Sequence, residues 1–458
     1  MKLTNILRTL VVTATLAGAT TSYAQTLHSG YFLESMVQRH EMNAAFGGEA
    51  NYIMLPGLGG LQMGIHTNFG LSNYVFNRNG EMVTGFSSQV TAQEFIGQLP
   101  EMQRLGIDID IPVLSVGFRG MGGFNTIVIK ERNDINLAIP SSLMAFIKTG
   151  NNTSNGAIYD IDNLGLQVNA IGELALGHSR KLDALEGFSY GAKVKLLVGL
   201  ARASVQIDHI GLSLTSDSWQ ATSTGSAQFS QGIDMVYENG EFSSIKFGNY
   251  NIGGWGLGFD LGAVYTPAAL PELTVSVGVN DLGFIKWNNM SNAVAGGTFE
   301  YNGFENIASD DAPLEEQLDV ILEDVKELIN LQEAPAISPT YQLKTTLNVG
   351  AEYAILGRKI SFGLLSSTRF AGQYTYAEGM AVVNFRPLTW LHVALNGSYS
   401  TYGGALGTLV NICPNGFNIF FGCDYFAPTM TFNNQMVPIN TVNANFRVGI
   451  AFPFGKKG

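Results

Sequence analysis

GWGLGFDLGAVY, at residues 254–265, is the stretch that decides the fold. Large apolar side chains such as Trp255, Phe259 and Leu261 alternate in it with glycines and Asp260. Because successive side chains of a strand point to opposite faces, this stretch predicts a strand with one apolar face and one small or polar face. Ten residues span about 33 Å along a strand, or about 25 Å of height at a tilt of ~40°, which is the apolar height of a transmembrane β-barrel.

The same alternation recurs along the chain. It is clearest at residues 61–71, 254–265, 273–280, 341–353, 391–396 and 442–452. In the last of these segments, Phe446, Val448 and Ile450 alternate with Asn445 and Arg447. We expect the apolar set to face lipid and the polar set to face the lumen, so that arginine at position 448 costs about 2–4 kcal/mol near the midplane.

Composition also favours a surface that mostly does not face water. Charged residues make up 14% of the chain, against an average near 25%. The sequence nevertheless contains no run of 18 apolar residues, so it predicts no transmembrane helix. A closed barrel is the other structure that satisfies every backbone group within a bilayer. We therefore predict an all-β, transmembrane antiparallel β-barrel.

The barrel is expected to have an even number of strands. Our best count is 16, and 14 is allowed because 204–230 has the weakest alternation. The expected strands lie near 60–76, 105–119, 124–138, 164–180, 188–200, 204–215, 218–230, 252–267, 273–287, 341–356, 358–371, 378–387, 389–401, 404–413, 417–427 and 440–454. Short turns are expected at 120–123, 181–187, 267–272, 356–358, 387–388 and 414–416, and long connections at 77–104, 140–163, 231–251 and 288–340.

The first residues predict a secretory signal peptide. Lys2 and Arg8 precede a short apolar stretch, and Ser22-Tyr23-Ala24 is a small-x-small cleavage site. We expect residues 1–24 to be removed and residues 25–458 to form the barrel, with both termini periplasmic. The remaining 23 Lys and Arg against 37 Asp and Glu give a net charge of −14, which disfavours nucleic acid as a partner.

Residues 312–333 predict an amphipathic loop helix. Leu314, Leu318 and Leu322 belong to an apolar stripe at helical spacing, and Pro335 follows its end. Counting strands back from a periplasmic C-terminus places this helix on the extracellular side. It could gate the barrel mouth, present a partner surface, or pack on neighbouring loops with no gating role.

Charged residues on the polar strand faces are the candidate site residues. We expect them to line the lumen and to tune permeation. They are Asp108, Asp110, Lys193, Lys195, Asp260, Lys344, Glu352 and Arg447. Cys413 and Cys423 flank a predicted hairpin turn and would lie roughly 20 Å apart, so we predict no disulfide between them.

Motifs for catalysis or metal binding have simpler structural interpretations. Residues 187–191 match the G-x-S-x-G elbow of hydrolases around Ser189, but they lead into a predicted strand rather than a helix. None of the six histidines has a His or Cys at ligand spacing, so we expect no zinc site. Gly57-Leu58-Gly59-Gly60 fits a turn before the first strand. We expect no enzyme activity and no cofactor.

Several motifs together resemble a known family. Residues 31–33, 43–46 and 52–56 resemble the opening of an uncharacterised family of Bacteroidota outer-membrane proteins, residues 173–179 and 191–195 its middle, and residues 281–287 and 417–424 its later part. Ala44 departs from the Pro that the family has in Asn-Pro-Ala. That family is similar to long-chain fatty-acid transporter barrels and to barrel subunits of a gliding-associated secretion system. The resemblance implies an outer-membrane barrel and names neither a substrate nor a catalytic residue.

Two functions from different classes follow. The first is a porin-like or hydrophobic-solute transport barrel in the outer membrane of a Gram-negative bacterium, with lipid and small solutes as partners. The alternative is a barrel subunit for secretion, surface assembly or attachment, which binds other envelope proteins. An outer-membrane hydrolase is a distant third. A continuous or laterally open path would favour transport, and a plugged barrel with large ordered outer loops would favour partner binding.

Overall fold

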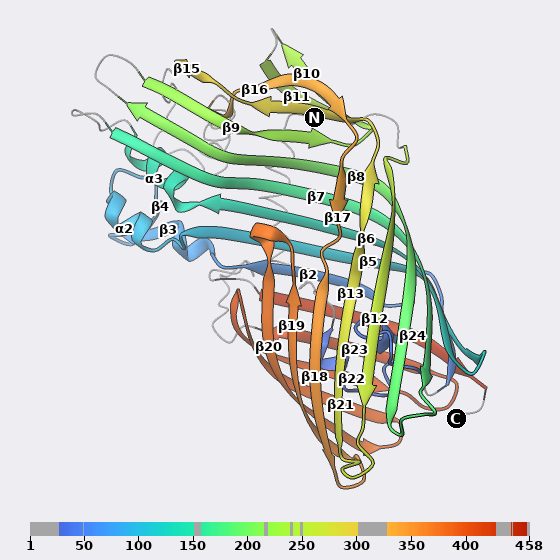
Figure 1. Ribbon diagram of the computed structural model, residues 1–458. Helices are drawn as coiled ribbons and strands as arrows, with labels where there is room; N and C mark the ends of the chain where they lie inside the picture. The colour runs from blue at the N-terminus through green and yellow to red at the C-terminus, as the bar shows by residue number, and fades with distance from the viewer. Residues whose placement is uncertain are drawn as a thin grey trace.

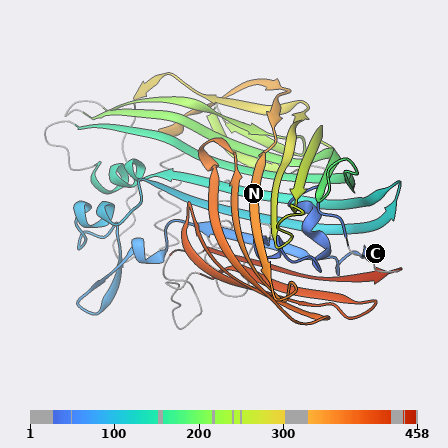
Figure 2. The same cartoon turned by 60° about the horizontal axis from the view of Figure 1, so that its bottom comes forward.

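The computed structural model describes residues 27–455 except 49, 151–156, 215–218, 239–240, 248–250, 301–327, 427–440 and 442. Its main sheet is antiparallel and closes on itself (Figures 1 and 2). Closure joins the two ends of the chain, because β1 (Asn51–Met54) and β2 (Leu61–Thr67) pair with β24 (Asn443–Phe454) on one side and with β5 (Met102–Gly120) on the other. The predicted all-β antiparallel barrel is therefore confirmed.

Fourteen strands form the wall, and four of them are interrupted. The interrupted ones are β1 with β2, β9 with β12, β13 with β14 and β15, and β16 with β17 and β18. The remaining bounds are β6 Gly123–Pro140, β7 Ala157–Lys181, β8 Phe188–Leu214, β9 Trp219–Phe229, β12 Gly254–Tyr265, β13 Leu273–Trp287, β14 Met290–Ala295, β15 Thr298–Glu300, β16 Leu331–Ile337, β17 Thr340–Gln342, β18 Thr346–Ile355, β19 Ile360–Arg369, β20 Tyr376–Leu388, β21 Leu391–Ser400, β22 Gly403–Ile412 and β23 Asn418–Phe426.

The best count of 16 strands is wrong by two, for two physical reasons. The stretches 188–200 and 204–215 are one strand, β8, whose pattern breaks where the register shifts opposite Ala170 and Ile171. The stretches 218–230 and 252–267 are two halves of one wall strand, because the chain leaves the wall between them and forms the hairpin of β10 (Ile233–Glu238) and β11 (Glu241–Phe247). A β-bulge or an excursion looks like a strand end in sequence.

The connections between strands are short at one end of the barrel and long at the other, as predicted. Five of the six short turns lie where we expected them, whereas the sixth is displaced, because residues 387–388 still belong to β20 and the turn to β21 is at 389–390. The β5–β6 turn lies at the same end as the end of β24, since Tyr52 pairs with both Gly117 and Pro453. We call this end, at the lower right of Figure 1, the lower zone. The residues Leu55–Gly60 interrupt the first wall strand rather than precede it.

The opposite end, the upper zone, has an apolar core of its own. Strands β7, β8 and β9 extend beyond the rest of the wall there, and two short helices pack against them (Figure 1). The additional elements are α2 Ala92–Gly97, α3 Ser141–Thr149, β3 Val75–Arg78, β4 Glu81–Thr84 and the 3-10 turns Leu71–Asn73 and Gly372–Tyr374. Thr91 caps α2 by accepting from Glu94 N (3.2 Å). Phe95, Phe146 and Leu212 are at most 1% exposed, and we call their cluster the upper core.

Most of the helix predicted at 312–333 lies outside the described residues. Its end is visible, because Leu328 and Ile329 are helical and buried in the upper core. Asn330 then adopts a left-handed φ of 49°, which ends a helix. Residues 331–333 belong to β16, so the prediction that they are helical is wrong. The connection 288–340 likewise contains wall strands rather than loop alone.

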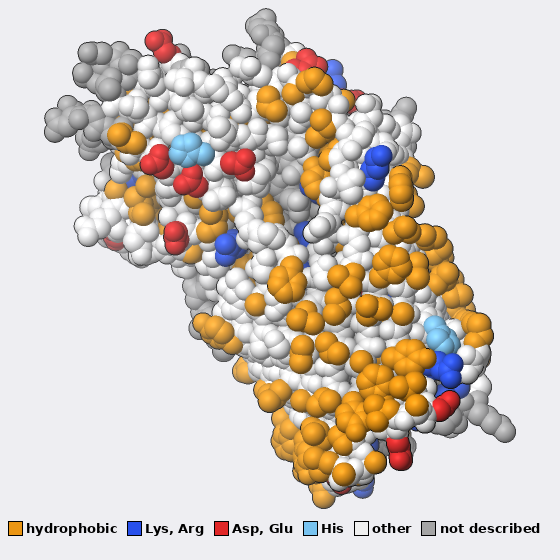
Figure 3. All heavy atoms as spheres, viewed as in Figure 1, with side chains coloured by type: hydrophobic (Ala, Val, Ile, Leu, Met, Phe, Trp, Pro, Cys, Tyr) orange, Lys and Arg blue, Asp and Glu red, His pale blue; other side chains and the backbone are white. Residues whose placement is uncertain are grey.

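The polarity of the exposed surface inverts between the zones, and β8 shows it within a single strand. In the lower zone Leu196 points outward and is 49% exposed, whereas Lys195 points inward and is 6% exposed. In the upper zone Leu212, on the same face of β8 as Leu196, is buried in the upper core, whereas Asp208 and Ser213 are exposed. Figure 3 shows the same division on one face, with hydrophobic side chains spread over the lower zone and acidic ones gathered on the upper zone.

None of the helices in the described part of the chain has the length and apolarity needed to cross a membrane.

Candidate functional site

Residues 27–48, which we call the plug, lie inside the lower zone. The plug contains two 3-10 turns, His28–Gly30 and Val37–Glu41. Leu27, Tyr31 and Leu33 are fully buried against inward-facing wall residues. The alternation of the wall strands gave no sign of this segment, because the plug has no period of its own.

Wall glycines make room for the plug. A Cβ at Gly191 would lie 2.1 Å from the carbonyl oxygen of Ala44, and a Cβ at Gly262 would lie 2.1 Å from Asn43 Oδ1. Because real Cβ atoms do not approach that closely, these inward positions need glycine. Among the glycines of 254–265, Gly262 therefore reflects a filled lumen, whereas Gly254 and Gly256 face the neighbouring strand β13.

Hydrogen bonds tie the plug to strands all around the wall. The plug-to-wall contacts include His28 Nδ1 with Glu378 Oε2 (2.7 Å), Ser29 N with Asp424 Oδ2 (3.1 Å), Tyr31 Oη with Ser276 Oγ (3.0 Å), Ser35 Oγ with His392 Nδ1 (2.6 Å) and Asn43 Nδ2 with Val277 O (3.1 Å). These partners come from β13, β20, β21 and β23. The plug thus connects several wall strands through the interior of the lower zone.

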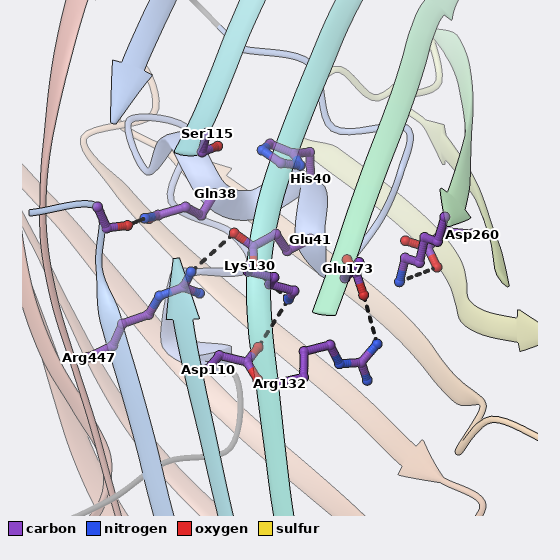
Figure 4. A network of polar contacts seen from close by, with 12 residues as sticks. Gln38, His40, Glu41, Asp110, Ser115, Lys130, Arg132, Glu173, Asp260 and Arg447 are labelled. Atoms are coloured by element: carbon purple, nitrogen blue, oxygen red, sulfur yellow. Dashed lines mark hydrogen bonds and ion pairs between the residues drawn. The ribbon is translucent and has the colours of Figure 1, made fainter. Parts of the chain in front are cut away.

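Glu41 joins the plug to two cations of the wall (Figure 4). Arg447 Nη2 donates to its Oε1 (3.1 Å), and Lys130 Nζ donates to its Oε2 (3.4 Å). Burial alone would raise the pKa of Glu41, but these two cations hold it well below its ordinary value. Neighbouring His40 contacts Lys193 Nζ through Nδ1 (3.0 Å) and Tyr52 Oη through Nε2 (2.6 Å).

A second group of ion pairs continues from the plug across the wall. Arg132 donates to Glu173 Oε2 (2.9 Å) and to both oxygens of Asp281 (2.9 Å). Lys195 Nζ lies 2.7 Å from both Asp260 and Asp281. Asp281 adopts a left-handed φ of 60°, which is uncommon for a residue with a side chain, and its N–H donates to Asp260 Oδ1 (2.8 Å). The backbone here is shaped to bring carboxylates and cations together.

Above the plug, Arg132 and Asp281 border a cavity of about 440 Å³, which we call the chamber. Its lining is rich in charged and amide side chains, with a few apolar ones. The charged lining residues are Asp108, Asp110, Arg132, Asp134, Arg202, Asp281, Lys344 and Arg369, with His28 at the plug. The volume is in the range of small-molecule sites.

A loop between the short strands β19 and β20 crosses toward the long strands β7 and β8 at the top of the chamber. This loop, residues 370–375, joins β19 to β20, and its Phe370, Ala371 and Gly372 line the chamber. Gln373 Nε2 donates to Gln206 Oε1 of β8 (2.7 Å). A Cβ at Gly165 of β7 would lie 2.3 Å from Tyr374 Oη. The loop, which we call the lid, therefore presses against the opposite wall.

All eight predicted site residues lie inside the wall, but they do not form one cluster. Asp108, Asp110 and Lys344 line the chamber, where they pair with Arg369 (2.8 Å), Lys130 (3.0 Å) and Asp134. Lys193, Lys195, Asp260 and Arg447 lie beside the plug. Glu352 pairs with Arg358 (3.1 Å) and Arg386 (3.5 Å). Their role in permeation stays a prediction.

Sequence reasoning missed the partners of these residues. Glu41 lies in a plug without strand periodicity, and Arg132 and Asp134 share a strand with Asn133 and Asn136, where alternation is weak. Arg202 lies where the pattern of β8 breaks. Only Arg132 and Asp134 lay in a predicted strand (124–138), where charged residues in a chain poor in charge were a signal.

The catalytic motif that we set aside has a structural place. Ser189 lies in β8 and pairs with Val264, so residues 187–191 form no strand-to-helix elbow. Within the described ranges, no group of three or more His, Cys, Asp or Glu could hold a metal ion. Cys413 and Cys423 are free, and Cys423 pairs across the hairpin with Thr408, so the prediction of no disulfide is confirmed.

Comparisons with known proteins complete this description. The family model described as "Family of unknown function (DUF5723)" matches residues 44–424. No curated protein matches the chain. Three similar solved structures are the toluene transporter TodX of Pseudomonas putida (8% identity, 95% of each chain covered, TM-score 0.43), the toluene transporter TbuX of Ralstonia pickettii (10%, 93% of this chain and 100% of that one, 0.40) and a Pseudomonas aeruginosa FadL homologue (10%, 95% and 99%, 0.38). At these TM-scores the likenesses carry no conclusion about the solute.

Proposed function

The chain belongs to the family of unknown function DUF5723, and from this premise we propose that it is a gated transport barrel of the outer membrane. In this proposal a solute occupies the chamber, the plug closes the path on one side, and the lid closes it on the other. Removal of residues 1–24, periplasmic termini and a Bacteroidota source remain parts of the proposal that rest on sequence.

One observation carries the proposal: the chamber lies between two closures of different kinds. Below it the plug is held by buried ion pairs of Glu41, and above it the lid touches Gly165 and Gln206. A barrel that served only as a wall would need neither a cavity of about 440 Å³ nor a separate lid. The polar lining favours a hydrophilic solute over a hydrophobic one.

The outward apolar side chains of the lower zone support membrane insertion. Trp255, Phe259 and Leu261 are each about half exposed on one face of β12. Such a surface is costly in water and is typical of the lipid-facing band of a barrel. The upper zone, with its inverted polarity, would stand outside the bilayer.

Loosening the plug tests the proposal in the reconstituted full-length barrel. Glu41→Gln leaves Arg447 and Lys130 without their shared carboxylate, whereas the control Glu34→Gln removes only a half-exposed pair with Arg358. We expect low liposome swelling by monosaccharides for the wild type and for Glu34→Gln, and an increase of at least tenfold for Glu41→Gln. Faster hydrogen exchange in the plug of Glu41→Gln without any gain in permeation would contradict the proposal.

Partner binding remains the alternative, supported by the upper zone. Its core and its exposed acidic side chains, which include Asp160 and Asp162, form an ordered surface beyond the membrane band. If envelope proteins co-purify through this surface and every plug variant stays impermeable, the barrel is an attachment or secretion subunit rather than a transporter.

A further inference from the structure

Arg202 lies in β8 where the lower and upper zones meet. Its backbone N–H donates to Ser230 Oγ (2.8 Å), and its carbonyl oxygen accepts from Ser230 N (2.8 Å). Ser230 is where the chain leaves the wall to form the β10–β11 hairpin. The side chain lines the chamber and is only 5% exposed. The fold therefore fixes a buried guanidinium at the edge of the chamber.

The partners of this guanidinium are neutral. Arg202 Nη1 donates to Asn169 Oδ1 (2.5 Å), and its Cζ lies 3.9 Å from the centroid of the Tyr341 ring. Its Nε has no hydrogen-bond partner, and no carboxylate of the described chain lies within ion-pair distance. An arginine stays charged in proteins, and a buried charge without a counter-ion is unfavourable. The buried Arg202 guanidinium thus lacks a counter-ion among the described residues.

The other chamber cations differ from Arg202 in this respect. Arg132 is paired with Glu173 and Asp281. Arg369 pairs with Asp108 (2.8 Å), and Lys344 pairs with Asp134. Among the four cations that line the chamber, Arg202 is the one with no described carboxylate in an ion pair, although the charge of Asp134 reaches it from farther away.

From these contacts we infer that the chamber binds a small hydrophilic organic anion whose carboxylate or phosphate pairs with Arg202. The inference rests on the proposed transport function for its biological meaning. The planar guanidinium offers parallel N–H groups that match an oxyanion, and the Tyr341 ring holds one of its faces. The amide and hydroxyl groups around it, including Gln167 and Gln342, suit a polyhydroxylated body of about monosaccharide size.

A charge series on one molecular frame tests the inference without any variant. Glucuronate, glucose 6-phosphate, glucose and glucosamine are titrated into the purified full-length barrel by calorimetry. We expect glucuronate, glucose 6-phosphate or both to bind at least tenfold more tightly than glucose and glucosamine. Equal affinity for all four sugars would overturn the inference.

Variants then assign the binding to Arg202. Arg202→Gln should lose at least tenfold in affinity for the anionic sugar, and Arg202→Lys should lose less because it keeps the charge. The control Arg180→Gln removes an exposed arginine that lies 3.7 Å from Asp183, and it should bind like the wild type. The folded state of each variant is checked by the resistance of the barrel to unfolding in detergent. Unchanged affinity in a folded Arg202→Gln barrel would overturn the inference.

The test separates this inference from the proposed function. Binding is measured in detergent and needs no passage, whereas liposome swelling needs the plug to open. Anion binding through Arg202 without permeation in Glu41→Gln contradicts transport and leaves the anion site standing. Permeation in Glu41→Gln with equal affinity for all four sugars supports transport and overturns the anion site.

Discussion

The lower and upper zones share strands β6, β7 and β8 but bury opposite faces of them. In the lower zone the interior is charged and the exterior is apolar, so that Lys195 is buried while Leu196 is exposed. In the upper zone the face that is exterior below is buried instead, and its Ile210 and Leu212 lie in the upper core. A strand that continues through both zones must therefore meet two different solvents. The comparison teaches that the chamber lies where the sheet changes from one environment to the other.

The two interiors are also stabilised differently. The upper core is held by apolar burial and by aromatic contacts, such as Phe86 and Phe95 with ring centroids 5.1 Å apart. The plug is held by directional ion pairs and hydrogen bonds, such as those of Glu41 and His28. Ion pairs can be broken and re-formed with little change in shape, so the plug suits a moving part better than the upper core does.

The largest effect is expected when the plug loses its central carboxylate. Glu41→Gln should weaken plug docking by about 3–5 kcal/mol, because it leaves buried Arg447 and Lys130 uncompensated. Glu34→Gln should cost at most about 1 kcal/mol, since its pair with Arg358 is half exposed. Hydrogen exchange of plug amides measures both. Equal protection in the two variants would remove the distinction between a buried and a surface anchor.

An effect of similar size is expected in the upper core. Phe95 is fully buried and contacts Tyr74, Phe76 and Phe86. Phe95→Ala should cost about 3–5 kcal/mol, confined to the upper zone, while plug protection stays as in the wild type. Phe362→Ala, at a half-exposed outward position, is the control. Loss of plug protection in Phe95→Ala would show that the zones are one cooperative unit.

A smaller effect should distinguish the exposed surfaces of the two zones on one strand. Val194→Arg places a charge on the apolar exterior of the lower zone and should cost about 2–4 kcal/mol near the midplane of a bilayer. Ser213→Arg changes an exposed upper-zone position of the same strand and should stay within about 0.5 kcal/mol. Unfolding in lipid vesicles measures both. A similar cost at the two positions would contradict the inversion of polarity.

The smallest expected effect is a dependence of plug docking on pH. The pKa of Glu41 is held below its ordinary value of 4.5, so its contribution is present above pH 4.5 and is lost as the pH falls below that. Burial opposes the charged form of His28, but the Glu378 carboxylate raises its pKa above 6.5, so its contribution is present below pH 6.5 and is lost as the pH rises through the raised pKa. Plug docking should therefore be tightest between pH 4.5 and 6.5.

Conductance of the reconstituted barrel checks this profile, with a minimum expected in that window. Glu41→Gln should flatten the acidic side, and His28→Gln should flatten the alkaline side. A leak that does not vary with pH in the wild type would contradict these assignments.

The wall could be predicted from sequence because lipid imposes a strict period of two. Segments such as 254–265 and 443–454 have one environment on each face, so alternation locates both the strand and its faces. The count failed where this condition fails, at the register shift opposite Ala170 and at the excursion after Phe229. The eight candidate residues were placed on inward faces for the same reason that the strands were found.

The plug and the chamber could not be predicted in the same way. The roles of Glu41 and His28 depend on partners that are at least 89 residues away in sequence. The role of Arg202 depends on the lack of an ion-pair partner in the described chain. No local period encodes such contacts. The glycines facing the plug were visible in sequence, but their cause was not, because a small inward side chain fits a wet lumen as well as a filled one.

The surroundings of two exposed positions on β8 test the inversion of exposed polarity most directly. Nitroxide labels are attached in lipid vesicles to Leu196→Cys and to Ser213→Cys, each in a chain whose Cys413 and Cys423 have been replaced. The label at 196 should be reached by dissolved oxygen and shielded from a water-soluble nickel reagent, and the label at 213 should be reached by the nickel reagent. Equal access of the nickel reagent to both labels would show that β8 does not cross from lipid to water between Leu196 and Ser213.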